Sequence, residues 1–191
     1  KYGYKFAPDP ASVKSAMVGG IISNNASGMS CGIHANSHKM IQSAKIIFTD
    51  GTILDTGSDI SKAEFGNTHK SFIDKIIEIR DIINRDSDTY EILKKKYSIK
   101  NVTGLNMLPF IEYQDPFDII THLLVGSEGT LAFISEVVMK NLHIQPYTAS
   151  ALIYFKDVDN GCNCVIDLKK IGADAVELFD YKALLSVKNQ V

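Results

Sequence analysis

The sequence lacks several features that mark other classes of protein. Its 191 residues carry a formal net charge of only -2, and lysine and arginine are spread along it without a broad cationic stretch, which argues against a nucleic-acid partner. Its longest apolar runs are far below the roughly 20 residues of a membrane-spanning helix. Three cysteines, Cys31, Cys162 and Cys164, give no disulfide framework, and no signal-peptide pattern opens the chain. We therefore expect a reducing compartment and a cytoplasmic location.

Familiar nucleotide and metal motifs are also missing. The sequence contains neither the G-x-G-x-x-G pattern of dinucleotide folds nor a P-loop, which argues against an ordinary NAD fold and an ATPase. His34 and His38 are four residues apart, a metal-ligand spacing on a helix, but the small residues around them favour a loop and no further ligand accompanies them. We predict no metal site, and a structural role for Cys162 and Cys164.

Small residues dominate the segment 8–32, which indicates backbone exposed for contact. The apolar, β-prone segments 44–49 and 52–56 flank Asp50-Gly51. This pattern predicts a β-hairpin closed by a two-residue type I′ turn.

Three further elements follow from periodicity. Apolar residues recur every three or four positions over 68–85, which predicts an amphipathic helix covering the sheet. A shorter helix is expected over 87–97, capped by Asp86 or Ser87. Segment 130–140 is typical of a buried strand. We expect an antiparallel sheet that contains this strand and the hairpin.

A break in composition at Pro146 predicts a domain boundary, with domains at 1–145 and 146–191. The second part reads as the opening of a separate α+β unit. Its expected elements are a strand at 149–155, a helix at 159–171, a strand at 175–179 and a helix from Tyr181 onward.

Two glycine-rich segments, 16–20 and 25–28, are suited to anion binding, because free backbone N–H groups in such turns form concavities for phosphate. Either segment taken alone is also compatible with an ordinary tight turn.

Taken together and in order, the motifs resemble a known family. They are PDPAS (8–12), AMVGGIISNNASGM (16–29), FTDGTILDT (48–56), KNVTG (100–104) and GSEGTLAFISEV (126–137). This series resembles the FAD-binding domain of vanillyl-alcohol-oxidase-type flavoproteins, in the D-lactate dehydrogenase and glycolate oxidase branch. Within that branch it most resembles a bacterial subgroup fused to an iron-sulfur module. The resemblance covers about the first three quarters of the chain.

The resemblance implies an α+β fold: the second subdomain of the FAD-binding domain, an antiparallel sheet flanked by helices, then the start of a substrate domain. It implies that 16–20 approach the flavin and its phosphates through main-chain groups, and that Ile134 acts through its N–H and C=O. The better-known branches have a Thr-Arg-like pair where this chain has Asn36 and Ser37, which weakens that part of the assignment. The implied cofactor-binding residues are Pro10, Ser12, Ala16, Met17, Gly19, Gly20, Asn25, Ala26, Ser27, Gly28, Asn36, Ser37, Glu128, Gly129 and Ile134.

The implied activity is oxidation of a D-2-hydroxy acid such as D-lactate to the 2-oxo acid, with hydride passing to the flavin of FAD. The implied electron acceptor is a quinone, a cytochrome or an iron-sulfur relay, and an iron-sulfur cluster would lie in a module outside this chain. Peripheral attachment to the inner face of the membrane and an oligomer are both compatible with the resemblance. Two alternatives stay open: another flavin oxidase or reductase of the same superfamily, and a non-catalytic binding module whose glycine loops are only turns.

Because the first residue is Lys1 and a predicted helix is running at Val191, we expect the chain to be part of a longer protein. In the family, one part of the FAD site precedes the matched segment and the catalytic base follows it. We therefore assign no catalytic residue. Glu177 and Asp180 only resemble markers of the substrate domain, and we expect the chain alone to be inactive.

Overall fold

The computed structural model describes residues 2–29 and 31–188. The chain separates into two compact units, residues 1–144 and 145–191, and each is described by itself. Position Val191, where the sequence predicts that the last helix continues, lies outside the described residues. None of the described helices is long and apolar enough to span a membrane.

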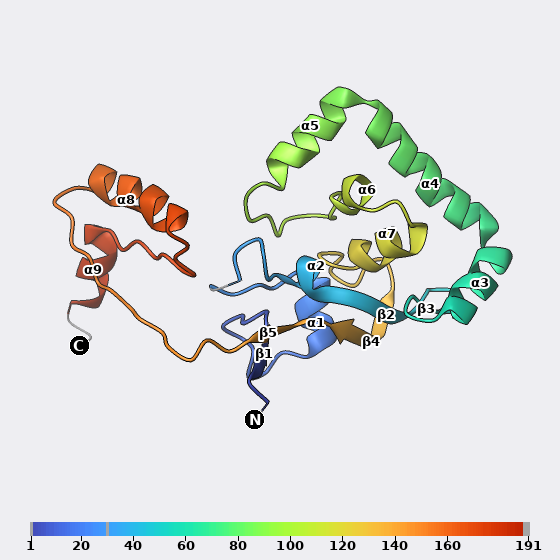
Figure 1. The fold of residues 1–191 in the computed structure, drawn as a ribbon, viewed down its shortest axis with the longest axis horizontal. Coiled ribbons are helices and arrows are strands. Elements are labelled where there is room, and N and C mark those ends of the chain that lie inside the picture. The colour runs from blue at the N-terminus through green and yellow to red at the C-terminus, as the bar shows by residue number, and fades with distance from the viewer. Residues whose placement is uncertain (1, 30, 189–191) are drawn as a thin grey trace. The chain divides into compact units, whose positions relative to one another are not determined.

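The first unit combines helices with two antiparallel sheets, which confirms the α+β class (Figure 1). Its strands are β1 (Tyr4–Phe6), β2 (Ile41–Ile47), β3 (Ile53–Asp55), β4 (Phe133–Met139) and β5 (Asn141–His143). Its helices are α1 (Val18–Ser23), α2 (Ser37–Met40), α3 (Asp59–Thr68), α4 (Lys70–Arg85), α5 (Ser87–Lys96), α6 (Pro109–Glu112) and α7 (Pro116–Leu123).

The larger sheet has the order β3-β2-β4, and β1 pairs with β5 in a separate ribbon. The predicted hairpin forms, with Lys45 opposite Asp55 and Ile47 opposite Ile53. Its turn is not type I′, because that turn needs a positive φ at both central residues and only Gly51 has one, at 84°. Instead the N–H of Gly51 donates to Phe48 O (3.0 Å), as in a three-residue loop that ends in a left-handed glycine.

The amphipathic helix expected at 68–85 is present as α4, with Ile76 and Ile83 buried. It does not lie directly on the sheet. Helix α7 contacts β2, and α4 packs outside α6 and α7 (Figure 1). The expectation that α4 covers the sheet is thus corrected: its buried residues join the same core, but through an intervening helical layer.

Helix α5 begins where expected, and Asp86 is its cap, because its carboxylate accepts from the N–H groups of Asp88 and Thr89. Helix α3 was not anticipated. Only Phe65 is buried among its ten residues, so its sequence lacks the apolar stripe that reveals an amphipathic helix.

The strand expected within 130–140 forms as β4 but is not buried. Its exposure alternates: Phe133 and Val138 are largely exposed, whereas Ile134 and Val137 pack against the core. β4 is an edge strand of its sheet. An antiparallel edge strand with one covered face needs apolar residues only on that face, so the apolar residues on its other face misled the sequence interpretation.

The second unit contains α8 (Val158–Lys170) and α9 (Tyr181–Val187), both near the expected positions. No strand forms at 149–155 or 175–179 in the described residues. These segments run as irregular chain, and parts of them pack on α8: a Cβ built on Gly161 would lie 3.1 Å from Leu178. A strand requires hydrogen-bonding neighbours, and the two segments do not pair with each other.

Candidate functional site

The predicted cofactor loops 25–28 and 126–129 lie together in the first unit. The side chain of Asn24 donates to Glu128 Oε1 (2.8 Å). The backbone N–H groups of Gly126 and Glu128 donate to Ile22 O (3.2 Å) and Ser23 O (2.8 Å). The end of α1 and the GSEG segment therefore form one continuous surface.

Helix α1 carries the glycine pair of the first motif. Gly19 and Gly20 lie in its first turn rather than in a loop, with Ala16 and Met17 just before it. The first N–H groups of a helix have no acceptor within the helix, and the side chain of Met17 does not cap them. They are therefore available to an acceptor outside the helix, such as a phosphate oxygen.

The two glycines differ in their surroundings. A Cβ built on Gly19 would lie 3.5 Å from Ile134 O, which brings this pair of predicted residues together. A Cβ built on Gly20 would meet nothing within 4 Å. Nothing in residues 2–29 and 31–188 therefore requires glycine at position 20.

Gly28 has a structural reason to be glycine. Its φ is 77°, and a Cβ there would overlap the backbone oxygen of Asp9. The N–H of Asp9 donates to Ser27 O (3.1 Å), so this loop packs directly against the PDPAS segment. In that segment Pro10 is buried, while Ser12 is exposed and its carbonyl accepts from the N–H of Ala16 (2.9 Å).

The KNVTG segment contacts the same surface. Lys100 Nζ donates to Gly28 O (2.8 Å). A small space bounded by Asn25, Asn101, Thr103, Gly104 and Gly126 lies beside it. All five motifs of the sequence series therefore belong to the first unit, and three of them, PDPAS, KNVTG and GSEGTLAFISEV, contact the loop 25–28 or the helix that leads into it.

Three buried polar atoms have no hydrogen-bond partner within the described residues: Asn25 Oδ1, Ser37 Oγ and Ser127 Oγ. Buried polar atoms are normally paired, so each is an exception that requires a reason. Asn25 and Ser37 were predicted to face the cofactor, and Ser127 precedes the predicted Glu128. The unpaired atoms thus fall in the segments that the sequence assigns to FAD.

Ser37 is the first residue of the one-turn helix α2, and Asn36 directly precedes it. Asn36 caps it, because its Oδ1 accepts from the N–H of Lys39 (3.0 Å). Ser37 is fully buried. The structure therefore gives Asn36 a local task, independent of any cofactor.

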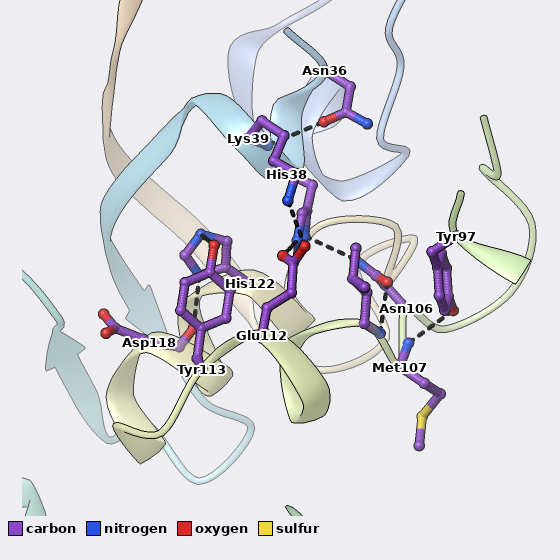
Figure 2. A network of polar contacts seen from close by, with 11 residues as sticks. Asn36, His38, Lys39, Tyr97, Asn106, Met107, Glu112, Tyr113, Asp118 and His122 are labelled. Atoms are coloured by element: carbon purple, nitrogen blue, oxygen red, sulfur yellow. Dashed lines mark hydrogen bonds and ion pairs between the residues drawn. The ribbon is translucent and has the colours of Figure 1, made fainter. Parts of the chain in front are cut away.

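A polar network adjoins α2, and sequence reasoning missed it (Figure 2). His38 is 2% exposed. Its Nε2 lies 2.9 Å from Glu112 Oε2, and its Nδ1 lies 2.9 Å from Asn106 Nδ2. Because Asn106 Oδ1 accepts from the N–H of Leu108 (3.1 Å), its amide nitrogen must face His38. His38 is thus held as the tautomer with hydrogen on Nε2.

His122 extends the network. Its Nδ1 donates to Asp118 O (2.7 Å), and its Nε2 accepts from the hydroxyl of Tyr113 (2.9 Å). The rings of His38 and His122 meet edge to face with centroids 5.0 Å apart. Burial lowers the pKa of His122 to about 4, since the bond to Asp118 O offsets only part of the loss of water.

The pKa values of two acidic groups in the network are shifted in opposite directions. Burial alone would raise the pKa of Glu112, but hydrogen bonds from His38 and Lys39 outweigh it and lower that pKa to about 2. Burial, followed by the negative charges of Glu112 and Asp118, raises the pKa of Tyr113 to about 12. At neutral pH the network therefore holds a carboxylate at Glu112, a neutral imidazole at His122 and a neutral phenol at Tyr113.

The sequence carried little signal for this network. His38 drew notice only for its spacing from His34, while its partners lie 68 and 74 residues away along the chain. Within residues 2–29 and 31–188, no group of three His, Cys, Asp or Glu is placed to hold a metal ion.

An open cleft of about 470 Å³ lies elsewhere, between α3 and the start of α7. None of the predicted site residues lines it. Its wall includes Asp59, Lys62, Asp115 and Phe117.

Comparison with known proteins finds one domain model and several dehydrogenases or oxidases. Residues 1–57 match the model of an FAD binding domain. The chain is 27% identical to a D-2-hydroxyglutarate dehydrogenase of Haemophilus influenzae, over all of this chain and 19% of that protein. It is 24% identical to a D-lactate dehydrogenase of Archaeoglobus fulgidus, over 96% of this chain and 30% of that protein. It is 22% identical to the glycolate oxidase subunit GlcD of Bacillus subtilis, over 98% of this chain and 29% of that protein.

No solved structure matches the chain significantly. The chain spans less than a third of the length of each of these three relatives. The order of the motifs and their assembly on one unit point to the same kind of protein as these matches. The chain is similar over nearly its whole length to proteins named D-2-hydroxyglutarate dehydrogenase, D-lactate dehydrogenase and glycolate oxidase subunit, and its first 57 residues match an FAD binding domain.

Proposed function

We propose that this chain forms one wall of the FAD site in an enzyme that oxidises a D-2-hydroxy acid to the 2-oxo acid. The observation that carries the proposal is the uncapped first turn of α1, which lies within the matched FAD binding domain and beside Ile134 of the GSEGTLAFI segment. Helix N–H groups without acceptors favour phosphate, and the open space at Gly20 leaves room for its approach.

The residues of this chain fit a role in binding rather than in proton transfer. The first-turn N–H groups of α1 would face the pyrophosphate. FAD supplies the hydride acceptor when it is bound. The base that takes the hydroxyl proton is assigned to no residue here.

Residues 1–145 are proposed to belong to the FAD-binding domain, and 146–191 to open the substrate domain. The named relatives act on D-2-hydroxyglutarate, D-lactate and glycolate, going by their names, so a small 2-hydroxy acid of the D-lactate kind is the proposed substrate. A quinone, cytochrome or iron-sulfur relay is the proposed electron acceptor, and the iron-sulfur module remains a prediction.

Anaerobic mixing of the full-length protein with D- and L-2-hydroxy acids tests the proposal. We expect its visible flavin absorbance to bleach with at least one D acid and to persist with the L enantiomer. A protein that purifies without flavin absorbance would instead favour the binding module without catalysis. A flavoprotein that no hydroxy acid reduces would favour another oxidase or reductase of the superfamily.

A further inference from the structure

Helix α2 is too short to hold its own shape. Its four residues give it few internal hydrogen bonds, and short helices in proteins depend on tertiary contacts. Besides the Asn36 cap and the bond from the N–H of Lys140 to Met40 O (2.7 Å), its side-chain contacts come from α6 and the loop at Asn106, both far along the chain.

Glu112 at the end of α6 supplies two of these contacts. One carboxylate oxygen accepts a hydrogen bond from His38 Nε2 (2.9 Å), and the other accepts one from Lys39 Nζ (2.5 Å). A single side chain therefore binds two consecutive residues of α2. Figure 2 shows both bonds converging on this carboxylate. Hydrogen bonds to a charged group are stronger than neutral ones, which makes Glu112 the principal anchor.

Asn106 completes the attachment from the other side. It bonds the second ring nitrogen of His38 and is held in turn by the N–H of Leu108. The neighbouring Met107 N–H donates to the hydroxyl of Tyr97 (2.9 Å). The ring of His38 therefore cannot rotate without breaking a hydrogen bond at each nitrogen.

The residues at the start of α2 contrast with this firm attachment. Ser37 is fully buried, yet its hydroxyl has no partner among the described residues. Asn36, the residue before it, stays partly exposed, so a bound cofactor can reach this turn at Asn36.

We infer that Glu112 and Asn106 are positioning residues, which act through His38 and Lys39 to hold the Asn36–Ser37 turn in place for the flavin cofactor. The inference rests on the proposed function. In this inference the His38 network does more than stabilise the fold, because it also sets the position in which the turn meets the cofactor.

The test compares variants of the full-length protein loaded with FAD. In Glu112→Gln we expect the dissociation constant for FAD to rise roughly tenfold, the effect of losing about 1.4 kcal/mol of preorganisation. We also expect a changed visible circular dichroism of the bound flavin. Lys39→Met removes one of the two bonds and should shift both readouts in the same direction by less. It also keeps the test open if Glu112→Gln does not fold.

Leu54→Ala is the control, because Leu54 is fully buried in β3 and lies outside the network. It should lower the urea midpoint without changing the flavin spectrum or affinity. Unchanged FAD affinity and dichroism in both network variants, or changes no larger than those in the control, would overturn the inference. A wild-type protein that holds no FAD would instead refute the proposed function.

Discussion

At the scale of single residues, glycines in the candidate site are there for different reasons. Gly28 has a positive φ and its Cβ position is filled by the backbone of Asp9, whereas the Cβ position of Gly20 is open. The first is required by the fold. The second has no explanation in the part of the chain that the structure describes, and the close approach of a cofactor would explain it.

Replacing these two glycines by valine should therefore separate folding from binding. In the full-length protein, Gly20→Val should abolish FAD retention and leave the urea midpoint nearly unchanged. Gly28→Val should lower the midpoint strongly, because it combines steric overlap with an unfavourable φ. Normal flavin content in Gly20→Val would show that the first turn of α1 does not meet the cofactor.

The buried histidine predicts a pH dependence. The pKa of His122 is about 4 in the folded chain against 6.5 for an unperturbed group, so between these values the unfolded chain binds more protons. Its contribution to stability is complete above pH 6.5 and is lost as the pH falls through 4, by an amount of roughly 3 kcal/mol at most. Between pH 4 and 6.5, the free energy of unfolding measured with urea should therefore rise more steeply with pH in the wild type than in His122→Phe.

The contribution of Glu112 to stability changes over a lower range of pH. Its pKa is about 2 when folded and 4.5 as a reference, so its contribution is present above pH 4.5 and is lost as the pH falls through 2. For His122, the contradicting result is a free energy of unfolding that changes equally with pH in the wild type and in His122→Phe between pH 4 and 6.5. That result would mean that His122 is not neutral and buried.

At the scale of elements, two glycines test local geometry. Gly51 closes the β2–β3 hairpin with a φ of 84°, so Gly51→Ala should lower the free energy of unfolding by roughly 1 kcal/mol. Gly66 lies inside α3, and its Cβ would be in ordinary contact with Phe117 at 3.9 Å. Gly66→Ala should therefore raise stability by roughly 0.5–1 kcal/mol. Urea midpoints moving in opposite directions are the expected result, and a more stable Gly51→Ala would be evidence against the turn described here.

The same scale shows what the sequence could reveal. The hairpin, α4 and α5 were predictable because turn residues, a 3.6-residue period and a capping aspartate are local signals. The turn type depends on the φ of Asp50, the exposure of Phe133 depends on which face of β4 is covered, and His38 depends on Glu112 and Asn106. These features arise from contacts between distant residues. No local pattern encodes them.

At the scale of the whole chain, the buried core belongs to the first unit. Both apolar clusters lie within residues 1–144, and Gly161 alone is buried among the described residues of 145–191. A unit of this length rarely forms a sufficient core by itself.

Truncation after Ile144 should consequently leave the cooperative unfolding of the chain intact. We expect the same urea midpoint and near-ultraviolet circular dichroism for residues 1–144 as for all 191. A clear fall in the midpoint would mean that the second unit contributes to the stability of the first.

The central claim is that this chain provides one wall of an FAD site whose remaining wall lies elsewhere in the protein. A dinucleotide is held by burial of most of its surface and by donors on more than one side of its pyrophosphate. The deciding measurement is the amount of flavin released on denaturing the full-length protein and the isolated 191-residue chain. The account predicts close to one FAD per full-length protein and little in the isolated chain. Stoichiometric FAD in the isolated chain, or none in the full-length protein, would contradict it.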